Sequence, residues 1–210
     1  MKRKTIQKGV YVVVDPEMEQ NRLIGQLKKI RGKPISAIQL WNNPNAKITS
    51  HLIEAILALF KNTDTPILIN NEWEYLNKYD LDGVHFDEFP TDLEQINKKV
   101  KREFIKGITL TNDLEKLAEI EAMGFDYLSF CSVFPSATSN SCDLVDLKTI
   151  QDCREQTNIP IFLSGGITPE NLNQLCHLNY DGVAIVSGIM KAADPEKALE
   201  NYLNELKQYQ

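Results

Sequence analysis

The sequence has no excess of basic residues and no long apolar run. Its 23 Lys and Arg residues are outnumbered by 29 Asp and Glu residues, which gives a formal net charge of −6. This balance argues against nucleic acid as the main partner, because phosphate backbones are bound by basic surfaces. No apolar stretch approaches membrane-spanning length, and the basic start of the chain is not followed by the apolar core of a signal peptide. We therefore expect a cytoplasmic protein that does not act on a membrane.

Cysteine is scarce, and the cysteines present are not clustered. Cys131, Cys142, Cys153 and Cys176 include no Cys-x-x-Cys pair, which disfavours a zinc site or a thioredoxin-type redox pair. We expect reduced thiols, as is usual in cytosolic proteins. A Gly-x-Gly-x-x-Gly motif is also absent after the first apolar run, and its absence disfavours a dinucleotide-binding open sheet.

Short apolar runs rich in β-branched residues alternate with longer segments of helical periodicity. Nearly continuous apolar runs are typical of parallel strands that are buried on both faces. We expect strands at Val10–Val14, Ile35–Leu40, Pro66–Asn70, Gly83–Phe86, Phe104–Gly107, Tyr127–Cys131, Ile159–Leu163 and Gly182–Val186. We expect helices at Glu17–Ile30, Thr49–Lys61, Asp113–Met123, Leu144–Thr157, Pro169–Leu178 and Pro195–Lys207. Asp15, Thr168 and Asp194, each followed by proline, are expected to cap the helices that follow them.

About eight strand–helix repeats at this spacing predict an α/β fold, a (β/α)₈ TIM barrel with a parallel sheet and right-handed crossovers. The length of 210 residues is ordinary for one such barrel. No linker or low-complexity segment divides the chain, so we expect a single domain over residues 1–210. The main alternative is an open, doubly wound sheet.

Two glycine-bearing turns follow the last two expected strands, at Ser164–Ile167 and Val186–Ile189. Glycine lets the backbone approach an anion closely and adopt a positive φ, and TIM barrels bind phosphate at this place. A short helix over Ser187–Met190 would add free backbone N–H groups. The residues expected to bind phosphate are Gly165, Gly166, Ser187 and Gly188. The alternative is that these glycines only form tight turns.

With these motifs in place, the chain resembles the thiamine-phosphate synthase family, which includes the related TenI-like thiazole tautomerases. The resemblance covers nearly the whole chain in order. It is carried by Tyr11–Asp15, Gln39, Asn70-Asn71, Asp82–His85, Phe134–Ser139, Gly165–Ile167 and Gly182–Ile189. The Asp-Gly-Val-His segment that ends at His85 and the two phosphate turns are the most specific of these matches in combination.

The resemblance implies a reaction that joins a pyrimidine diphosphate to a thiazole phosphate and releases pyrophosphate. The partner is then a small-molecule phosphorylated heterocycle, whose phosphate also meets the hydroxyls of Ser136 and Thr138. On this reading the reacting side is lined by His85, Gln39, Asn70 and Asn71. His85 is a candidate acid–base group if it faces the mouth of the barrel, and otherwise a structural histidine at a strand end. A homodimer is compatible with the sequence, which does not specify the oligomeric state.

The sequence departs from the family pattern on the diphosphate side. Trp41 and Asn43 replace an Arg and a Lys, Asn71 and Pro90 replace two metal-binding Asp residues, and Ser139 replaces a Lys. Each charge-assisted hydrogen bond lost in this way is worth about 1.5–3 kcal/mol. Trp41 either stacks on a heteroaromatic ring or fills the space of the missing Arg.

The family also implies Mg²⁺ held by carboxylates, for which Asp87 and Glu88 are the candidates from a shifted position. The alternative for this pair is a plain acidic loop. Lys47, just beyond the second expected strand, is a candidate replacement cation or a solvated residue. Thr111 stands where the tautomerases carry a proton-transferring His, and a threonine does not shuttle protons near neutral pH.

Several functions therefore stay open. The first is a synthase in thiamine biosynthesis with a divergent diphosphate side. The alternatives are a TenI-like thiazole-phosphate isomerase, a non-catalytic paralogue that binds a phosphorylated heterocycle, and another barrel enzyme that acts on sugar or amino-acid phosphates.

Overall fold

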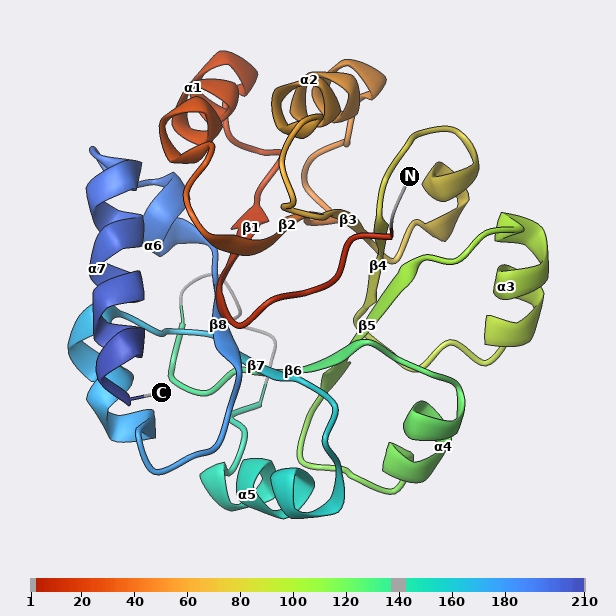
Figure 1. The fold of residues 1–210 in the computed structure, drawn as a ribbon, viewed down its shortest axis with the longest axis vertical. Helices are drawn as coiled ribbons and strands as arrows, with labels where there is room; N and C mark the ends of the chain where they lie inside the picture. Colours follow the sequence, from red (N-terminus) through yellow and green to blue (C-terminus); the bar gives the residue numbers. More distant parts are fainter. Residues whose placement is uncertain (1–2, 137–142, 210) are drawn as a thin grey trace.

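The computed structural model describes residues 3–136 and 143–209, and its strands form a closed barrel (Figure 1). The strands pair in parallel in chain order, and β8 closes the barrel on β1. They are β1 (Gly9–Val14), β2 (Ile35–Leu40), β3 (Ile67–Asn70), β4 (Gly83–Phe86), β5 (Ile105–Leu110), β6 (Tyr127–Cys131), β7 (Ile161–Ser164) and β8 (Gly182–Ile185). The predicted (β/α)₈ architecture is confirmed, and the open sheet is excluded.

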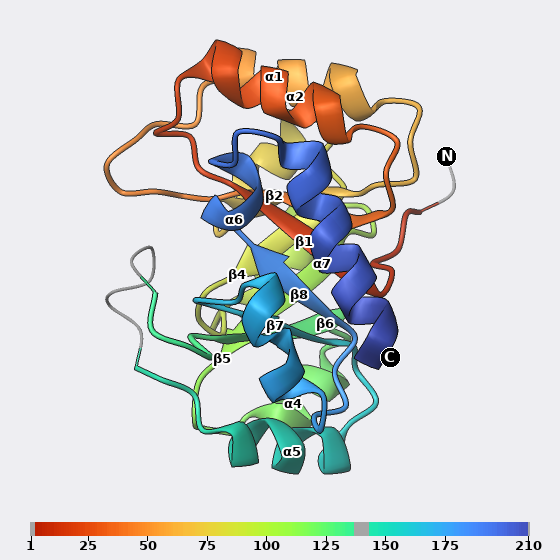
Figure 2. The same ribbon diagram turned by 90° about the vertical axis from the view of Figure 1, so that its left-hand side faces the viewer.

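Helices surround the barrel and cover the outer faces of the strands (Figure 1). They are α1 (Gln20–Ile30), α2 (Ser50–Phe60), α3 (Leu93–Val100), α4 (Leu117–Ala122), α5 (Leu147–Gln156), α6 (Ser187–Met190) and α7 (Pro195–Tyr209), with 3₁₀ helices η1 (Trp73–Asn77) and η2 (Pro169–Leu175). The carboxyl-terminal α7 packs against α1, α6 and η2 and contacts β1 (Figure 2). Among the described residues, no helix combines the length and the apolar character needed to cross a membrane.

The start of α1 differs from the expectation. The helix begins at Gln20, and the carboxylate of Glu19 caps it by accepting the N–H groups of Asn21 and Arg22, each at 2.8 Å. Asp15 does not cap α1, because its Oδ1 accepts the side chain of Asn43 at 2.8 Å. The first strand–helix loop is therefore tied to the second one at the mouth of the barrel.

The barrel interior is filled by large rings. Tyr11, Tyr127 and Phe162 are buried there with ring centroids 5.7–5.8 Å apart in edge-to-face contacts. Glycines on neighbouring strands make room for them: a Cβ on Gly107 would lie 2.0 Å from the Tyr127 ring, and one on Gly182 would lie 2.5 Å from Phe162. These rings form the floor beneath the carboxyl-terminal mouth of the barrel.

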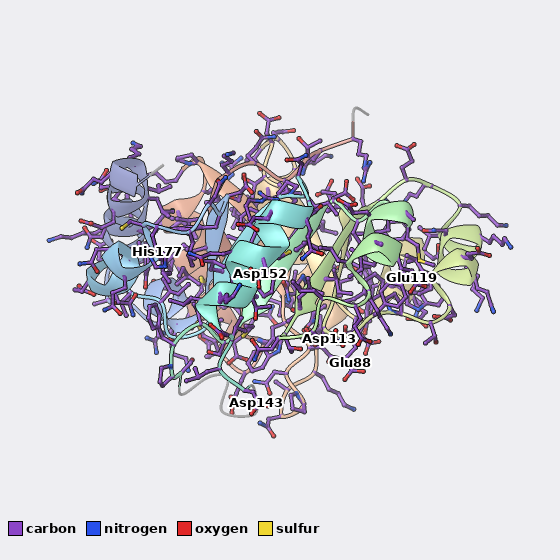
Figure 3. All side chains as sticks on the ribbon, turned by 90° about the horizontal axis from the view of Figure 1, so that it is seen from below. Glu88, Asp113, Glu119, Asp143, Asp152 and His177 are labelled. Carbon is purple, nitrogen blue, oxygen red and sulfur yellow. The ribbon has the colours of Figure 1, made fainter. Side chains whose placement is uncertain are left out.

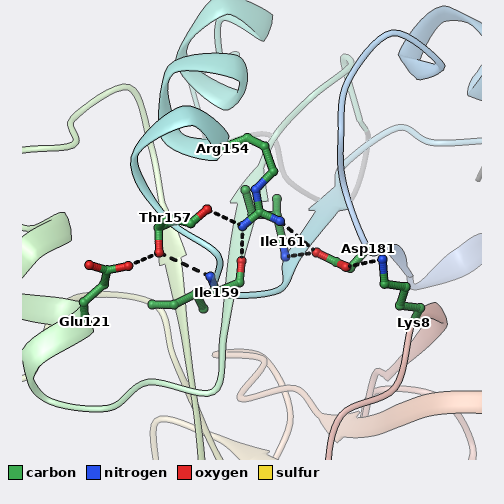
Figure 4. Close-up of polar contacts among 7 residues, drawn as sticks. All are labelled: Lys8, Glu121, Arg154, Thr157, Ile159, Ile161 and Asp181. Atoms are coloured by element: carbon green, nitrogen blue, oxygen red, sulfur yellow. Dashed lines mark hydrogen bonds and ion pairs between the residues drawn. The ribbon is translucent and has the colours of Figure 1, made fainter.

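Three aspartates close the amino-terminal end of the barrel. Asp82, Asp126 and Asp181 directly precede β4, β6 and β8. Each accepts, at 2.8–2.9 Å, a backbone N–H from the first or second residue of the preceding strand. The segment before β1 supplies a cation to each of them, namely Lys4, Arg3 and Lys8 respectively. Arg154 also binds Asp181 and donates to the carbonyl groups of the loop between α5 and β7 (Figure 4).

Candidate functional site

A cavity of about 1130 Å³ opens at the carboxyl ends of the strands. The predicted site residues that line it are Gln39, His85, Asp87, Glu88, Ser136, Gly165, Gly166, Ser187 and Gly188. Thr138 lies outside the described residues. Asn70 and Asn71 do not line the cavity, but both donate hydrogen bonds to Asp87, which does. One cavity thus brings together both glycine turns and the segment ending at His85.

The turn after β7 has a conformation that only glycine adopts readily. Gly165 and Gly166 have φ values of +88° and +63°. A Cβ on Gly165 would lie 1.9 Å from the hydroxyl oxygen of Ser132, and one on Gly166 would lie 2.5 Å from the carbonyl oxygen of Pro135. Phe134 N donates to Gly165 O at 3.1 Å, so the loop after β6 is bonded to this turn. The two glycines allow this close packing while the turn still borders the cavity.

The second turn begins the short helix α6, as expected. Ser187 and Gly188 are exposed at its first turn and line the cavity. Tyr202 from α7 joins the two turns, because its hydroxyl donates to Ile167 O at 3.0 Å and a Cβ on Gly188 would lie 2.3 Å from that hydroxyl. Burial raises the pKa of Tyr202 to about 12, which keeps this donor protonated. The two turns are therefore held in a fixed relation.

A chain of buried hydrogen bonds crosses the cavity floor. The hydroxyl of Tyr11 donates to Gln39 Oε1 at 2.7 Å and lies 2.8 Å from the hydroxyl of Tyr127. The same Tyr127 hydroxyl lies 2.8 Å from His85 Nδ1, and His85 Nε2 lies 2.8 Å from Thr109 Oγ1. Burial lowers the pKa of His85 to about 4, against a smaller opposite effect of the Asp87 charge. His85 is therefore neutral at physiological pH and has hydrogen bonds at both ring nitrogens.

Two amides hold the carboxylate of Asp87 beside this chain. Asn70 Nδ2 donates to Asp87 Oδ1 at 3.0 Å, and Asn71 Nδ2 donates to Asp87 Oδ2 at 2.8 Å. The backbone fixes both amide orientations, since Asn70 Oδ1 accepts the N–H of Asn42 and Asn71 Oδ1 accepts that of Asp87. N–H groups thus face both carboxylate oxygens, and each takes up one lone pair of its oxygen.

The Mg²⁺ that the resemblance implies does not fit this arrangement. In the part of the chain that the structure describes, no three His, Cys, Asp or Glu side chains are grouped as a metal site. Asp87 and Glu88 both line the cavity, but each Asp87 oxygen already accepts an N–H from the amide of Asn70 or Asn71. Oxygen ligands, not N–H donors, are what Mg²⁺ requires.

The cavity mouth is acidic. Asp87, Glu88, Asp113 and Asp143 line it, and no Lys or Arg does so among the described residues. Figure 3 shows Glu88, Asp113 and Asp143 gathered along one edge of the molecule, apart from Glu119. Lys47 is exposed and does not line the cavity, and the segment 137–142 contains no Lys or Arg in its sequence. Near these four acidic side chains the field therefore favours positive charge.

The positions of the missing family cations have other partners. Trp41 lines the cavity and packs against the barrel-interior cluster that contains Tyr11. Asn43 is buried and donates to Asp15. Thr111, at the tautomerase His position, is exposed at the cavity wall. Trp41, Asn43 and Thr111 thus form part of the wall and the supporting contacts at the mouth of the barrel, and none of them supplies a positive charge.

Sequence reasoning did not identify Tyr11, Tyr127 and Thr109 as site residues. Their signal was weak, because each lies within a short and mostly apolar strand. Tyr11 and Tyr127 both point into the barrel, where an aromatic hydroxyl needs a hydrogen-bond partner. A tyrosine that points into the barrel from a strand was the feature that could have revealed Tyr11 and Tyr127.

The chain is similar to known proteins over most of its length. The family described as thiamine monophosphate synthase matches residues 10–189. The thiamine-phosphate synthase of Clostridioides difficile is 29% identical over 196 residues, covering 92% of each chain, and that of Nitrosococcus oceani is 25% identical over 197 residues, covering 93% of this chain and 91% of its own. Among solved structures, a Pyrococcus furiosus thiamine phosphate pyrophosphorylase superposes with a TM-score of 0.77 at 22% identity, covering 99% of this chain and 98% of its own. At 22% identity, this superposition shows the fold alone.

Proposed function

This chain belongs to the thiamine monophosphate synthase family, and on that premise we propose that it couples a pyrimidine diphosphate to a thiazole phosphate in the cavity described above. The observation that carries the proposal is the pair of glycine turns, which Tyr202 joins at one side of the cavity. The phosphate of the thiazole would lie against Gly165, Gly166, Ser187 and Gly188, with Ser136 beside them. The ring would then point toward Gln39 and His85.

The reaction breaks the bond between the pyrimidine methyl carbon and its diphosphate oxygen, and the electron pair leaves with pyrophosphate. The lone pair of the thiazole nitrogen then forms the new carbon–nitrogen bond, which gives a positively charged thiazolium ring. Positive charge thus develops at the reacting carbon and remains in the product. The acidic lining formed by Asp87, Glu88, Asp113 and Asp143 supports this proposal, because fixed negative charge stabilises a developing cation.

The test is the formation of thiamine phosphate from the two substrates, measured with added Mg²⁺ and with a chelator. Binding of thiazole phosphate alone is measured in parallel by calorimetry. Turnover together with binding supports the proposal. A folded protein that does not bind thiazole phosphate contradicts the phosphate site, and with it the proposal.

A second candidate is binding of a phosphorylated heterocycle without diphosphate chemistry. Two observations favour it: within the described residues the cavity lining has no Lys or Arg, and both oxygens of Asp87 are bound by amides. A departing pyrophosphate ordinarily needs cationic groups around it. Tight binding of thiazole phosphate or thiamine phosphate without any turnover would select this candidate over the synthase.

A further inference from the structure

We infer that Tyr11 and Tyr127 are positioning residues that hold His85 in one tautomer, with the proton on Nδ1 and the lone pair of Nε2 directed to the cavity wall. The inference rests on the direction of the buried hydrogen-bond chain and is independent of the proposed reaction. The cavity floor then has a fixed pattern of donors and acceptors, which is set by two neutral phenols, one of them (Tyr11) at the cavity surface.

The direction of the chain follows from counting hydrogens. A phenol has one hydrogen to donate, and the hydroxyl of Tyr11 donates it to Gln39 Oε1 at 2.7 Å. The contact of 2.8 Å between the two tyrosine hydroxyls therefore requires Tyr127 to donate and Tyr11 to accept. Tyr127 then has no hydrogen left for His85, so His85 Nδ1 must carry the hydrogen in their 2.8 Å contact.

His85 is a neutral ring in this chain, and its tautomer determines which nitrogen accepts. A neutral imidazole has one N–H and one lone pair, and a ring that is protonated on Nδ1 accepts at Nε2. Nε2 therefore accepts the hydroxyl hydrogen of Thr109 at 2.8 Å. Burial keeps the ring neutral by lowering its pKa to about 4, and burial also raises the pKa values of Tyr11 and Tyr127, which keeps both phenols as donors. With Oε1 of Gln39 turned toward Tyr11, one arrangement of hydrogens satisfies every contact of the chain.

A ligand in the cavity meets both ends of the chain, and Tyr11 and His85 between them also line the cavity. Gln39 and Thr109 both line the cavity, on β2 and β5. Gln39 Nε2 has no hydrogen-bond partner among the described residues, and Thr109 Oγ1 retains its lone pairs after donating to His85. The floor thus offers an N–H donor at one end and an oxygen acceptor at the other. A ligand that matches it brings an acceptor to Gln39 and a donor to Thr109.

The tautomer can be read directly by ¹⁵N NMR of the imidazole nitrogens in the free protein. The chain has three histidines, so single His51→Gln and His177→Gln variants assign the His85 signals. In the wild-type protein near neutral pH, we expect His85 Nδ1 to be protonated and Nε2 unprotonated. A His85 ring protonated on Nε2 would overturn the inference.

The sharpest variant is Tyr11→Phe, because no hydrogen bond joins Tyr11 to His85. Loss of the Tyr11 acceptor frees the Tyr127 hydrogen to turn toward His85 Nδ1, so we expect the tautomer to invert to Nε2–H. Gln39→Glu retains an oxygen that only accepts, so we expect the wild-type tautomer there. Tyr202→Phe, which removes a buried hydroxyl outside the chain, is the matched control and should leave the tautomer unchanged.

A second variant, Tyr127→Phe, allows the inference to be tested even if Tyr11→Phe does not fold. Tyr127→Phe removes the hydroxyl that contacts His85 Nδ1, and we expect Nε2–H to become the main form, donating to Thr109. If Tyr11→Phe and Tyr127→Phe both fold and both keep the proton on Nδ1, the tyrosines do not position His85. None of these spectra depends on turnover. The inference about His85 can therefore fail while the proposed function holds, and the proposed function can fail while the inference holds.

Discussion

Asn71 and Asp87 are joined by two hydrogen bonds of opposite direction. Asn71 Nδ2 donates to Asp87 Oδ2 at 2.8 Å, and Asp87 N donates to Asn71 Oδ1 at 2.9 Å. This pair stands where the family resemblance places a carboxylate for Mg²⁺. The amide of Asn71 thus offsets the charge of Asp87 without a cation.

Asn71→Asp should create a cation requirement. Two carboxylates would then face each other, and we expect the free energy of unfolding to fall by about 1–3 kcal/mol in the absence of divalent cations. Millimolar Mg²⁺ should restore much of the loss, because a ligand that binds only the folded state stabilises it. The measurement is thermal unfolding of wild type and variant with Mg²⁺ or with a chelator.

The matched control is Asn71→Gly. Asn71 has a φ of +58°, which glycine adopts without strain, so this variant removes the amide and adds no charge. Its melting temperature should not respond to Mg²⁺, and neither should that of the wild type. A wild-type response as large as that of Asn71→Asp would show that a divalent-cation site already exists.

His85 should make the folded state sensitive to mild acid. Its pKa is lowered from 6.5 to about 4 by burial, so the unfolded chain takes up a proton at a higher pH than the folded chain does. The contribution of His85 to stability is therefore full above pH 6.5 and is lost as the pH falls toward 4, by up to about 3 kcal/mol. Tyr127 and Asp87 are the titratable groups that act on the ring.

The measurement is the free energy of unfolding in urea at pH 7 and pH 4.5. Carboxylates also titrate in this range, so wild type is compared with His85→Gln, in which we expect a clearly smaller loss. His51→Gln, which removes an exposed histidine, should behave as the wild type does. Equal losses in wild type and His85→Gln would contradict the neutral, buried state of His85.

Most strands could be predicted from the sequence because they are nearly continuous apolar runs between polar segments, although β5 extends to Leu110 rather than ending at Gly107. The first residues of the helices were harder to predict. Asp15 followed by proline is a good helix-capping signal, but its carboxylate binds Asn43 and α1 begins beyond it. The short helix α3 was missed although Leu93, Ile96 and Val100 bury one face of it. Eight residues give too few apolar positions to stand out against a polar loop.

The glycine turns of the site could be predicted because their residues are adjacent in sequence and follow recognisable strands. The hydrogen-bond chain could not. Tyr11 and Tyr127 are 116 residues apart, and their hydroxyls meet only because the closed barrel brings β1 and β6 to face each other across its interior. The hydrogen bonds from Asn70 and Asn71 to Asp87 likewise depend on the strand register that places Asn70 opposite His85.

Charge at the start of α6 should control phosphate binding. Ser187 is exposed there, and Asp is a good residue for a helix start, so Ser187→Asp should fold normally. Its carboxylate would repel a bound phosphate, and we expect the affinity for thiazole phosphate to fall by about 10- to 100-fold. Calorimetric titration measures the change.

Ser187→Asn is the isosteric neutral control and should lose at most a few-fold in affinity. Gly166 is a poorer place for this test, since a Cβ there would lie 2.5 Å from the carbonyl oxygen of Pro135 and would disturb the turn itself. If Ser187→Asp and Ser187→Asn bind equally well, the phosphate does not lie at this turn.

The Asp181 cluster at the other end of the barrel should contribute to stability unequally through its two cations. Asp181 pairs with Arg154 at 3.2 Å, where both side chains are largely buried, and with Lys8 at 2.9 Å, whose side chain is 71% exposed (Figure 4). Asp181→Asn leaves Arg154 without its buried partner, and we expect a loss of about 2–3 kcal/mol in the free energy of unfolding. Lys8→Ala should cost less than about 1 kcal/mol, because exposed ion pairs are weak.

Urea unfolding of the two single variants and of the double variant measures both effects. The Lys8 effect should shrink further in high salt, whereas the Asp181→Asn loss should persist, since buried pairs are screened little. In the double variant the Lys8 contribution should disappear, because Lys8 acts through the charge of Asp181. Equal costs for Lys8→Ala and Asp181→Asn would mean that the amino-terminal segment, rather than Arg154, provides the main stabilising contact at this end of the barrel.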